Sequence, residues 1–147
     1  MTASTLHSFE CRVYSEDTDA GGVVYNANYL KFYERARTEF LRSLGFEQDD
    51  LLEQNIVFVV RNITVDFVQA ARFNDLLLVE TRVDKLKKAS LVFAQQIFST
   101  SARAQSTTQP VLINEARVMV VCVTADKFKP SAIPAEIYRK LTGPDHE

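Results

Sequence analysis

The hydrophobic pattern between residues 28 and 44 predicts an amphipathic helix. Apolar side chains recur there every three or four positions, a spacing that places them on one helix face: Tyr29, Tyr33, Ala36, Phe40 and Leu44. Leu30, Phe32 and Leu41 widen this face, so we expect a largely buried helix.

Both ends of this helix carry residues that commonly end helices. Asn26 or Asn28 can act as the N-cap, because an asparagine side chain accepts hydrogen bonds from first-turn N–H groups. Gly45 follows the last turn and readily adopts the left-handed conformation of a helix C-terminus. The sequence therefore predicts where the helix starts and stops.

Elsewhere the apolar pattern favours strands. Apolar and polar side chains alternate over residues 63–67 and 77–83, as in strands with one buried face. Residues 91–98 and 112–123 are rich in Val, Ile and Phe, and we expect central strands covered on both faces. Residues 9–14 form a further strand-like run before the helix.

This order of elements predicts an α+β domain in which an antiparallel sheet wraps around a helix. The polar residues 99–110 predict a flexible loop, and Pro134 is suited to open a short helix over residues 134–141. We expect one domain over residues 1–147, without internal repeats. Because one helix covers only one sheet face, the free face and edges predict self-association.

Composition narrows the range of functions. The chain has 17 basic and 19 acidic residues and a net charge of −2, which gives no field directed at nucleic acid. Because no apolar run approaches membrane-spanning length and the first residues do not form a signal peptide, we expect a cytoplasmic protein without a membrane span. Cys11 and Cys122 lie in apolar runs and are expected to be free, structural thiols.

The residue inventory excludes several kinds of catalytic site. The two histidines, His7 and His146, lie near the ends of the chain, which disfavours Ser-His-Asp and Cys-His arrangements. The G-x-S-x-G, H-E-x-x-H, paired C-x-x-C and P-loop motifs are absent from the sequence, so we expect no metal or nucleotide cofactor. A carboxylate therefore remains as the group available for proton transfer or nucleophilic attack.

The motif EDTDAGG, just before the helix, places two carboxylates in an unusual setting. Asp17 and Asp19 precede the flexible pair Gly21-Gly22, and the helix start supplies unpaired N–H groups that can bind an oxyanion. A carboxylate opposite such donors suits acyl transfer. A hydrogen-bonded turn that only stabilises the helix start explains the same residues, and both interpretations stay open at this point.

The same region resembles a known enzyme family. The segment VYSEDTDAGGVVYNANYLKFYERARTEFLRSLGF is similar to YbgC-type acyl-CoA thioesterases of the hotdog superfamily, which are associated with the Tol-Pal cell-envelope system and resemble 4-hydroxybenzoyl-CoA thioesterase. The resemblance continues through FVVRNITVDFVQAARFNDLLLVET, KKASLVFAQQIF, INEARVMVVCV and KPSAIP. It implies a hotdog fold and homodimers or homotetramers with active sites at the subunit interface.

The resemblance also implies roles for individual residues. Asp19 corresponds to the catalytic acid, acting as nucleophile or general base, and the backbone N–H of Asn26 corresponds to the oxyanion donor. Many relatives have histidine or an aromatic residue at position 26, but any residue except proline keeps the N–H. The implied reaction releases CoA and a carboxylic acid, with the CoA thioester as substrate and no cofactor.

Further residues are candidates for substrate binding. Gly22 allows close approach, and Tyr25 and Tyr29 are placed to line an acyl pocket, although core packing explains the tyrosines equally well. The candidate cations for the CoA phosphates include Arg61, Lys87 and Lys88, together with Arg72, Lys127 and Lys129.

Other interpretations of the acidic residues and of the reaction were weighed. Glu34 on the helix is the competing catalytic base, and Asp17 is expected to brace the turn. A hydroxyacyl-thioester dehydratase is disfavoured because neither histidine is suitably placed. A scaffold that binds acyl carrier protein in phospholipid metabolism, with little turnover, stays open. Acyl chain length is not determined by the sequence.

Overall fold

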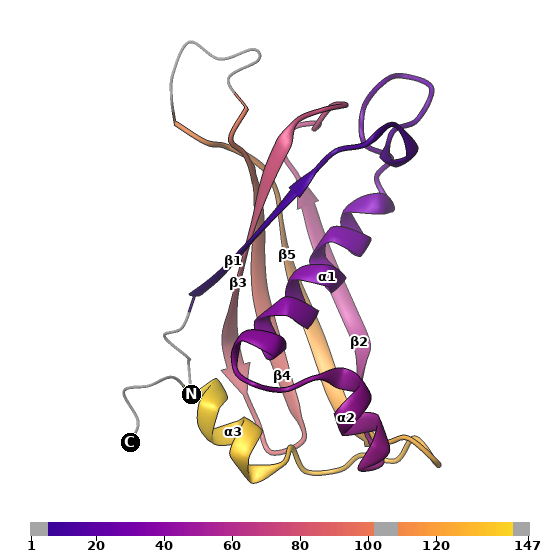
Figure 1. Cartoon of the computed structure of the whole chain (residues 1–147), viewed down its shortest axis with the longest axis vertical. Helices are drawn as coiled ribbons and strands as arrows, with labels where there is room; N and C mark the ends of the chain where they lie inside the picture. Colours follow the sequence, from indigo (N-terminus) through magenta and orange to yellow (C-terminus); the bar gives the residue numbers. More distant parts are fainter. Residues whose placement is uncertain (1–5, 102–108, 143–147) are drawn as a thin grey trace.

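Alternating apolar positions assemble five strands into one antiparallel sheet around a long helix, as the computed structural model shows (Figure 1). The structure describes residues 6–101 and 109–142. The elements in chain order are β1 (Leu6–Arg12), the short 3-10 turn η1 (Ser15–Asp17), α1 (Asn28–Ser43), α2 (Gln48–Glu53), β2 (Ile56–Phe67), β3 (Leu76–Leu86), β4 (Ser90–Ser99), β5 (Val111–Thr124) and α3 (Ala135–Leu141).

The strands lie in the order β1-β3-β4-β5-β2, and each neighbouring pair is antiparallel. β1 and β2 therefore form the two edges of the sheet. Register shifts interrupt the pairing at Val60/Asn62, Val83/Lys85 and Ile97/Phe98, and such bulges increase the bend of a strand. The predicted α+β hotdog architecture, a helix wrapped by a curved antiparallel sheet, is confirmed.

Helix α1 crosses one face of the sheet and supplies much of the core (Figure 1). Its inward residues include Phe32, Tyr33 and Phe40, which are almost completely buried. β3 alternates as expected between buried and less buried side chains, and β4 alternates as well. The expectation that the central strands are covered on both faces is wrong for the single chain, because outward side chains such as Ala94 and Gln96 are only half-buried.

The C-terminal end of α1 follows the expected pattern, whereas its start does not. Gly45 has φ +96°, its N–H donates to the Arg42 carbonyl oxygen at 2.9 Å, and the Phe46 N–H donates to the Leu41 carbonyl oxygen at 3.0 Å. Left-handed glycine caps of this kind satisfy the last carbonyl groups. At the start, the N-cap is Ala27 and makes no side-chain cap, so the expected asparagine N-cap is wrong.

One helix was not predicted, and one strand is longer than expected. α2 was not predicted, because six residues in a polar link give a weak periodic signal. β2 begins at Ile56 rather than residue 63, since its first half is an apolar run without alternation. The predicted C-terminal helix is confirmed as α3, preceded by Pro134. Of the predicted loop 99–110, residues 102–108 lie outside the described residues.

Buried polar side chains tie α1 to the sheet. The Gln95 amide nitrogen donates to the Tyr33 carbonyl oxygen at 3.1 Å and to Thr81 Oγ1 at 2.8 Å, and Arg37 Nη1 donates to Gln95 Oε1 at 3.1 Å. The Tyr33 hydroxyl donates to Asn114 Oδ1. Because buried polar groups are costly when unpaired, these contacts favour one position of the helix on the sheet.

Stability is expected to fall as the pH drops below about 6.5, because His7 is held in an apolar site. Its ring packs edge-on against Phe40, and its Nδ1 is buried without a partner among the described residues. Burial lowers the pKa of His7 from 6.5, and Glu39 partly opposes this shift. The unfolded chain therefore binds the proton more tightly, so the contribution is complete above pH 6.5 and is lost as the pH falls toward the folded-state pKa.

Thermal unfolding of wild type and His7→Phe between pH 8 and pH 5 measures this dependence. Phenylalanine keeps the ring contact with Phe40 and cannot titrate, so its melting temperature should depend less on pH. His146 is present in both proteins and cancels in the comparison. Equal pH dependence in the two proteins would contradict the assignment to His7.

Candidate active site

The acidic motif folds into a tight hairpin immediately before α1. The Asp19 N–H donates to the Val23 carbonyl oxygen at 2.9 Å, and the Gly22 N–H donates to the Asp19 carbonyl oxygen at 3.0 Å. Thr18 and Val24 pair across the two arms. Gly22 has φ +81°, a conformation that glycine adopts without steric cost, so this position needs glycine for the turn itself.

The carboxylate of Asp19 lies at the exposed tip of this hairpin. Its Oδ1 accepts a hydrogen bond from the Gly21 N–H at 2.9 Å, which fixes the orientation of the group. Its Oδ2 has no hydrogen-bond partner within residues 6–101 and 109–142. The turn anticipated as a structural alternative is therefore present, and it leaves one carboxylate oxygen available for chemistry.

Asp17 has a different environment from Asp19. It is 8% exposed, and both of its carboxylate oxygens are used: Oδ2 accepts from the Tyr14 N–H at 2.8 Å and Oδ1 from Asn28 Nδ2 at 2.7 Å. Its carbonyl oxygen also accepts from the Tyr25 N–H at 3.0 Å. These contacts join the hairpin to the start of α1 and confirm that Asp17 braces the turn.

Replacing Asp17 with alanine is expected to destabilise the fold by about 2 kcal/mol, because the Tyr14 N–H and the Asn28 side-chain amide lose their acceptors at a buried position. Urea denaturation measures the change in the free energy of unfolding. Asp19→Ala is the matched control, expected to cost about 0.5 kcal/mol or less, since the one hydrogen bond that it removes is exposed to water. Equal urea midpoints for Asp17→Ala and wild type would contradict the bracing role.

The start of α1 presents an unused backbone donor close to the hairpin in sequence. The Asn28 N–H donates to the Tyr25 carbonyl oxygen at 2.8 Å, and the Leu30 N–H donates to the Ala27 carbonyl oxygen at 3.2 Å. The Asn26 N–H has no partner in the described part of the chain. Asn26 lies two residues before the 16-residue helix α1, whose positive end favours an anionic oxygen nearby.

Tyr29 and Tyr25 occupy different places. Tyr29 is 2% exposed, and its hydroxyl accepts from the Ala71 N–H at 3.0 Å. The Ala71 carbonyl oxygen in turn accepts from the Val24 N–H at 2.9 Å, so Tyr29 supports the loop that pairs with the hairpin. This placement favours the packing interpretation for Tyr29. Tyr25 is 55% exposed at the surface before α1.

The structure does not bring the candidate cations together in one chain. Lys87 and Lys88 lie at the turn between β3 and β4, at the end of the sheet opposite the hairpin (Figure 1). Arg61 lies in the middle of β2 beside a bulge. Arg72, by contrast, pairs with Val23 of the hairpin, a proximity that required the tertiary fold to find.

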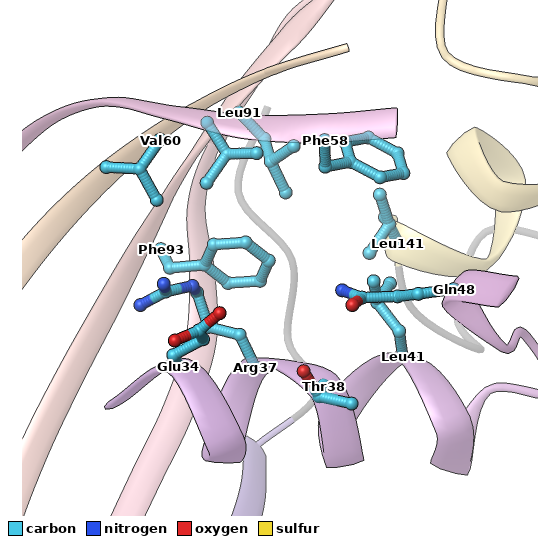
Figure 2. Close-up of a pocket in the computed structure, with 11 residues that line it drawn as sticks. Glu34, Arg37, Thr38, Leu41, Gln48, Phe58, Val60, Leu91, Phe93 and Leu141 are labelled. Atoms are coloured by element: carbon cyan, nitrogen blue, oxygen red, sulfur yellow. The ribbon is translucent and has the colours of Figure 1, made fainter. Parts of the chain in front are cut away.

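A pocket of about 100 Å³ opens along α1 (Figure 2), and no residue of the hairpin that carries Asp19 lines it. Its walls come from α1, α2, three strands and α3, and its lining residues are Glu34, Arg37, Thr38, Leu41, Gln48, Phe58, Val60, Leu91, Phe93, Val120 and Leu141. Glu34, the competing base, therefore lies at this pocket and not at the hairpin.

The cysteines are poorly suited to nucleophilic catalysis. Burial raises the pKa of the Cys11 thiol to about 11, with Arg35 opposing the shift, and burial also raises the pKa of Cys122. Both thiols are free. A thiol that stays protonated near neutral pH is a weak nucleophile, so a carboxylate remains the better candidate.

Comparison with known proteins assigns the family. A sequence model of the Thioesterase-like superfamily matches residues 13–141, which include the hairpin, all of α1 and every strand after it. The chain belongs to the Thioesterase-like superfamily. The resemblance to YbgC-type acyl-CoA thioesterases, noted from the sequence motifs, is confirmed by similar proteins of that type.

Two relatives are similar over most of their length. The acyl-CoA thioester hydrolase YbgC of Escherichia coli O157:H7 is 48% identical over 134 residues, covering 91% of this chain and 94% of its own. The acyl-CoA thioesterase YbgC of Haemophilus influenzae is 47% identical over 131 residues, covering 88% and 90%.

Solved thioesterase structures share the fold. A probable thioesterase from Bartonella henselae superposes with a TM-score of 0.74 at 34% identity, covering 89% of this chain and 100% of that one. The 4-hydroxybenzoyl CoA thioesterase from Pseudomonas sp. strain CBS-3 superposes with a TM-score of 0.80 at 21% identity, covering 94% and 99%. Within the described residues, no helix of this thioesterase-like chain has the length and apolarity that crossing a membrane requires.

Proposed function

We propose that this protein hydrolyses acyl-CoA thioesters to free CoA and a carboxylic acid. The observation that carries the proposal is the placement of a partly unpaired carboxylate, Asp19, and an unpaired backbone donor, Asn26 N–H, on one hairpin and helix start. Membership of a thioesterase superfamily, with YbgC acyl-CoA thioesterases as relatives, supports the same reaction.

Asp19 has two possible chemical roles in this reaction. As a general base, it takes a proton from water while the water oxygen bonds to the thioester carbon. As a nucleophile, its own oxygen bonds to that carbon, and water then hydrolyses the resulting anhydride. In both routes the carbonyl oxygen becomes an oxyanion that accepts from the Asn26 N–H, and it reforms the carbonyl as the carbon–sulfur bond breaks. The thiolate leaves readily and takes up a proton.

Substrate binding is proposed for residues that surround this chemistry. Gly22 leaves the tip of the hairpin open, because no atom beyond its two chain neighbours lies within 4 Å of where its Cβ would be. The exposed ring of Tyr25 is available to an acyl or pantetheine chain. We propose that the CoA phosphates bind Arg61, Lys87 and Lys88. Because Lys87 and Lys88 lie at the end of the sheet opposite the Asp19 hairpin, these cations would come from a second subunit.

We therefore include a homodimer or homotetramer in the proposal. β2 is an edge strand, and apolar side chains are exposed along it and just after it at Val60, Phe67 and Val68. An edge strand with exposed apolar residues is suited to pairing with another copy. Light scattering during gel filtration distinguishes two and four copies, and a monomer would refute this part of the proposal.

The proposal also covers the number of domains, the cellular location and the absence of a cofactor. One domain over residues 1–147 agrees with the single sheet that the described elements share. A cytoplasmic location agrees with two free cysteines, which are typical of a reducing compartment. Association with the Tol-Pal system rests on the resemblance alone. Activity without a cofactor is tested by dialysis against a chelator, which should leave the rate unchanged.

Release of CoA from acyl-CoA substrates of increasing chain length tests the function directly. A thiol-reactive dye detects the product, and the same acyl groups on acyl carrier protein test the alternative carrier. Turnover on any CoA substrate supports the proposal and ranks the chain lengths. No release from any CoA substrate would refute it, and tight binding of acyl carrier protein with negligible turnover would then favour the scaffold alternative.

A further inference from the structure

The proposed reaction needs two groups that lie on different segments of the chain. Asp19 is at the tip of the hairpin, and the Asn26 N–H lies just before α1. Because a misplacement of about 1 Å can lower a rate by about 10²-fold, the hairpin has to keep one position relative to the helix. The contacts that hold it there involve a third segment, residues 68–75 between β2 and β3, here called the β2–β3 loop.

The β2–β3 loop pairs with the second arm of the hairpin. The Val24 N–H donates to the Ala71 carbonyl oxygen at 2.9 Å, and Val23 forms an antiparallel bridge with Arg72. The loop also closes on itself, because the Arg72 N–H donates to Asp75 Oδ2 at 3.0 Å. Asp75 is buried. The hairpin is therefore held on this side by a loop with a fixed shape of its own.

Tyr29 joins the same loop to α1. Its hydroxyl accepts a hydrogen bond from the Ala71 N–H at 3.0 Å. Ala71 therefore uses its N–H on the helix and its carbonyl oxygen on the hairpin. Tyr29 and Ala71 are both buried, so water does not readily replace the hydroxyl as acceptor. The path from α1 to the hairpin consists of two hydrogen bonds and the backbone of one alanine.

The ring of Tyr29 is itself fixed by packing. It lies edge-on to Phe32, with ring centroids 6.2 Å apart, and tilted against Phe67, with ring centroids 6.0 Å apart. Aromatic pairs at such separations attract each other beyond simple burial. The core of the protein therefore determines where the hydroxyl lies.

The Tyr29 hydroxyl is also close to the proposed catalytic carboxylate. Burial raises the pKa of Tyr29, the hydrogen bond from Ala71 opposes this shift, and the charges of Asp75 and Asp19 raise the pKa further. A carboxylate affects a neighbouring pKa in this way only from nearby. Tyr29 is therefore near Asp19 in space as well as linked to its hairpin by hydrogen bonds.

We propose that Tyr29 is a positioning residue, which holds the Asp19 hairpin in one place on α1 through the backbone of Ala71. The role requires no contact between Tyr29 and the substrate, because Tyr29 acts on the rate through Asp19. Its effect on the rate rests on the proposed function. Its effect on the hairpin does not, and can be measured without any substrate.

Hydrogen–deuterium exchange of full-length Tyr29→Phe, followed for each amide by NMR, tests the hold on the hairpin. The variant keeps the ring and removes the acceptor of the Ala71 N–H. The Asp19, Gly22 and Val24 amides should exchange at least about tenfold faster than in wild type, because a buried hydrogen bond that supports the hairpin is lost.

Tyr33→Phe is the matched control. It removes an equally buried hydroxyl one turn further along α1, and this hydroxyl donates to Asn114 of β5 instead of supporting the β2–β3 loop. Tyr33→Phe should lower the melting temperature about as much as Tyr29→Phe does, since each variant leaves a buried polar group without its partner. It should leave exchange of the hairpin amides unchanged.

Kinetics of the same variants tests the consequence for the reaction. Tyr29→Phe should lower kcat by about tenfold to a hundredfold and leave KM within about twofold, whereas Tyr33→Phe should keep kcat near the wild-type value. In the Asp19→Asn background, Tyr29→Phe should lower kcat by less than about twofold, because the group that Tyr29 positions is already inactive.

Unchanged hairpin exchange in folded Tyr29→Phe, or an equal increase in Tyr33→Phe, would overturn the positioning role. The full kcat loss of Tyr29→Phe in the Asp19→Asn background would also overturn it. If Tyr29→Phe does not fold, the Ala71 amide of wild type decides: it should be protected like the first turns of α1, and rapid exchange would overturn the role. Faster hairpin exchange in Tyr29→Phe, with no acyl-CoA hydrolysis by wild type, would refute the proposed function and still support the hold on the hairpin.

Discussion

Replacing Asp19 with asparagine is expected to lower kcat/KM for acyl-CoA hydrolysis by about 10³-fold. An amide can neither take a proton from water nor attack a thioester carbon effectively, and general-base catalysis alone contributes about 10² to 10⁴. The fold should be unaffected, since the asparagine oxygen can replace Asp19 Oδ1 as acceptor for the Gly21 N–H at 2.9 Å. CoA release under identical conditions measures the ratio of the two proteins.

An aspartate elsewhere on the surface provides the control. Asp50 is exposed on α2, and Asp50→Asn removes the same charge from the chain without touching the hairpin or the edge strand β2. It should retain nearly full activity. If folded Asp19→Asn hydrolyses its best substrate as fast as Asp50→Asn, then Asp19 is not the catalytic carboxylate. Glu34 would become the next candidate for the base.

Replacing Asn26 with proline is expected to lower kcat by about 10² to 10³, the usual effect of removing one oxyanion donor. Proline lacks the N–H that has no partner in the described structure. Asn26→Ala removes only the side chain and should retain most of the activity. This pair of variants separates the backbone donor from any contribution of the asparagine side chain.

The fold of Asn26→Pro tests whether the ring itself is harmful. The Asn28 N–H donates to the Tyr25 carbonyl oxygen at 2.8 Å, so residues 25–28 form a turn in which position 26 is the second residue, where proline is favoured. We expect Asn26→Pro to show the circular dichroism spectrum and the melting temperature of Asn26→Ala. Equal activity in folded Asn26→Pro and wild type, or a severe loss in Asn26→Ala, would contradict the assignment of the backbone donor at position 26.

The candidate chemistry was predictable because it lies within one short segment. The turn at Asp19, the need for glycine at position 22 and the free donor at the helix start all depend on residues close together in the chain. Residue types alone did not distinguish the two acids of the segment, and the different roles expected for Asp19 and Asp17 came with the family resemblance. Asp17 is satisfied by Tyr14 and Asn28, whereas Asp19 is exposed, and burial separates their roles.

Features formed by distant segments were not predictable in the same way. The placement of Lys87 and Lys88 opposite the hairpin follows from strand order, and the proximity of Arg72 to Val23 follows from loop packing. The α1 pocket is lined by residues from three helices and three strands, so no local sequence pattern predicts it. Arg37 appeared only as one charge on a helix until its burial was known.

The sequence by itself therefore determined the long helix, the approximate positions of the strands, the fold class and the segment that carries the proposed chemistry. Hydrophobic periodicity and turn residues act over a few positions, and their effects can be identified without knowing the rest of the chain. Only the tertiary structure decided which charges are buried, which donors are unpaired and where a pocket forms. These properties depend on the exclusion of water by segments far apart in sequence, and packing alone brings those segments together.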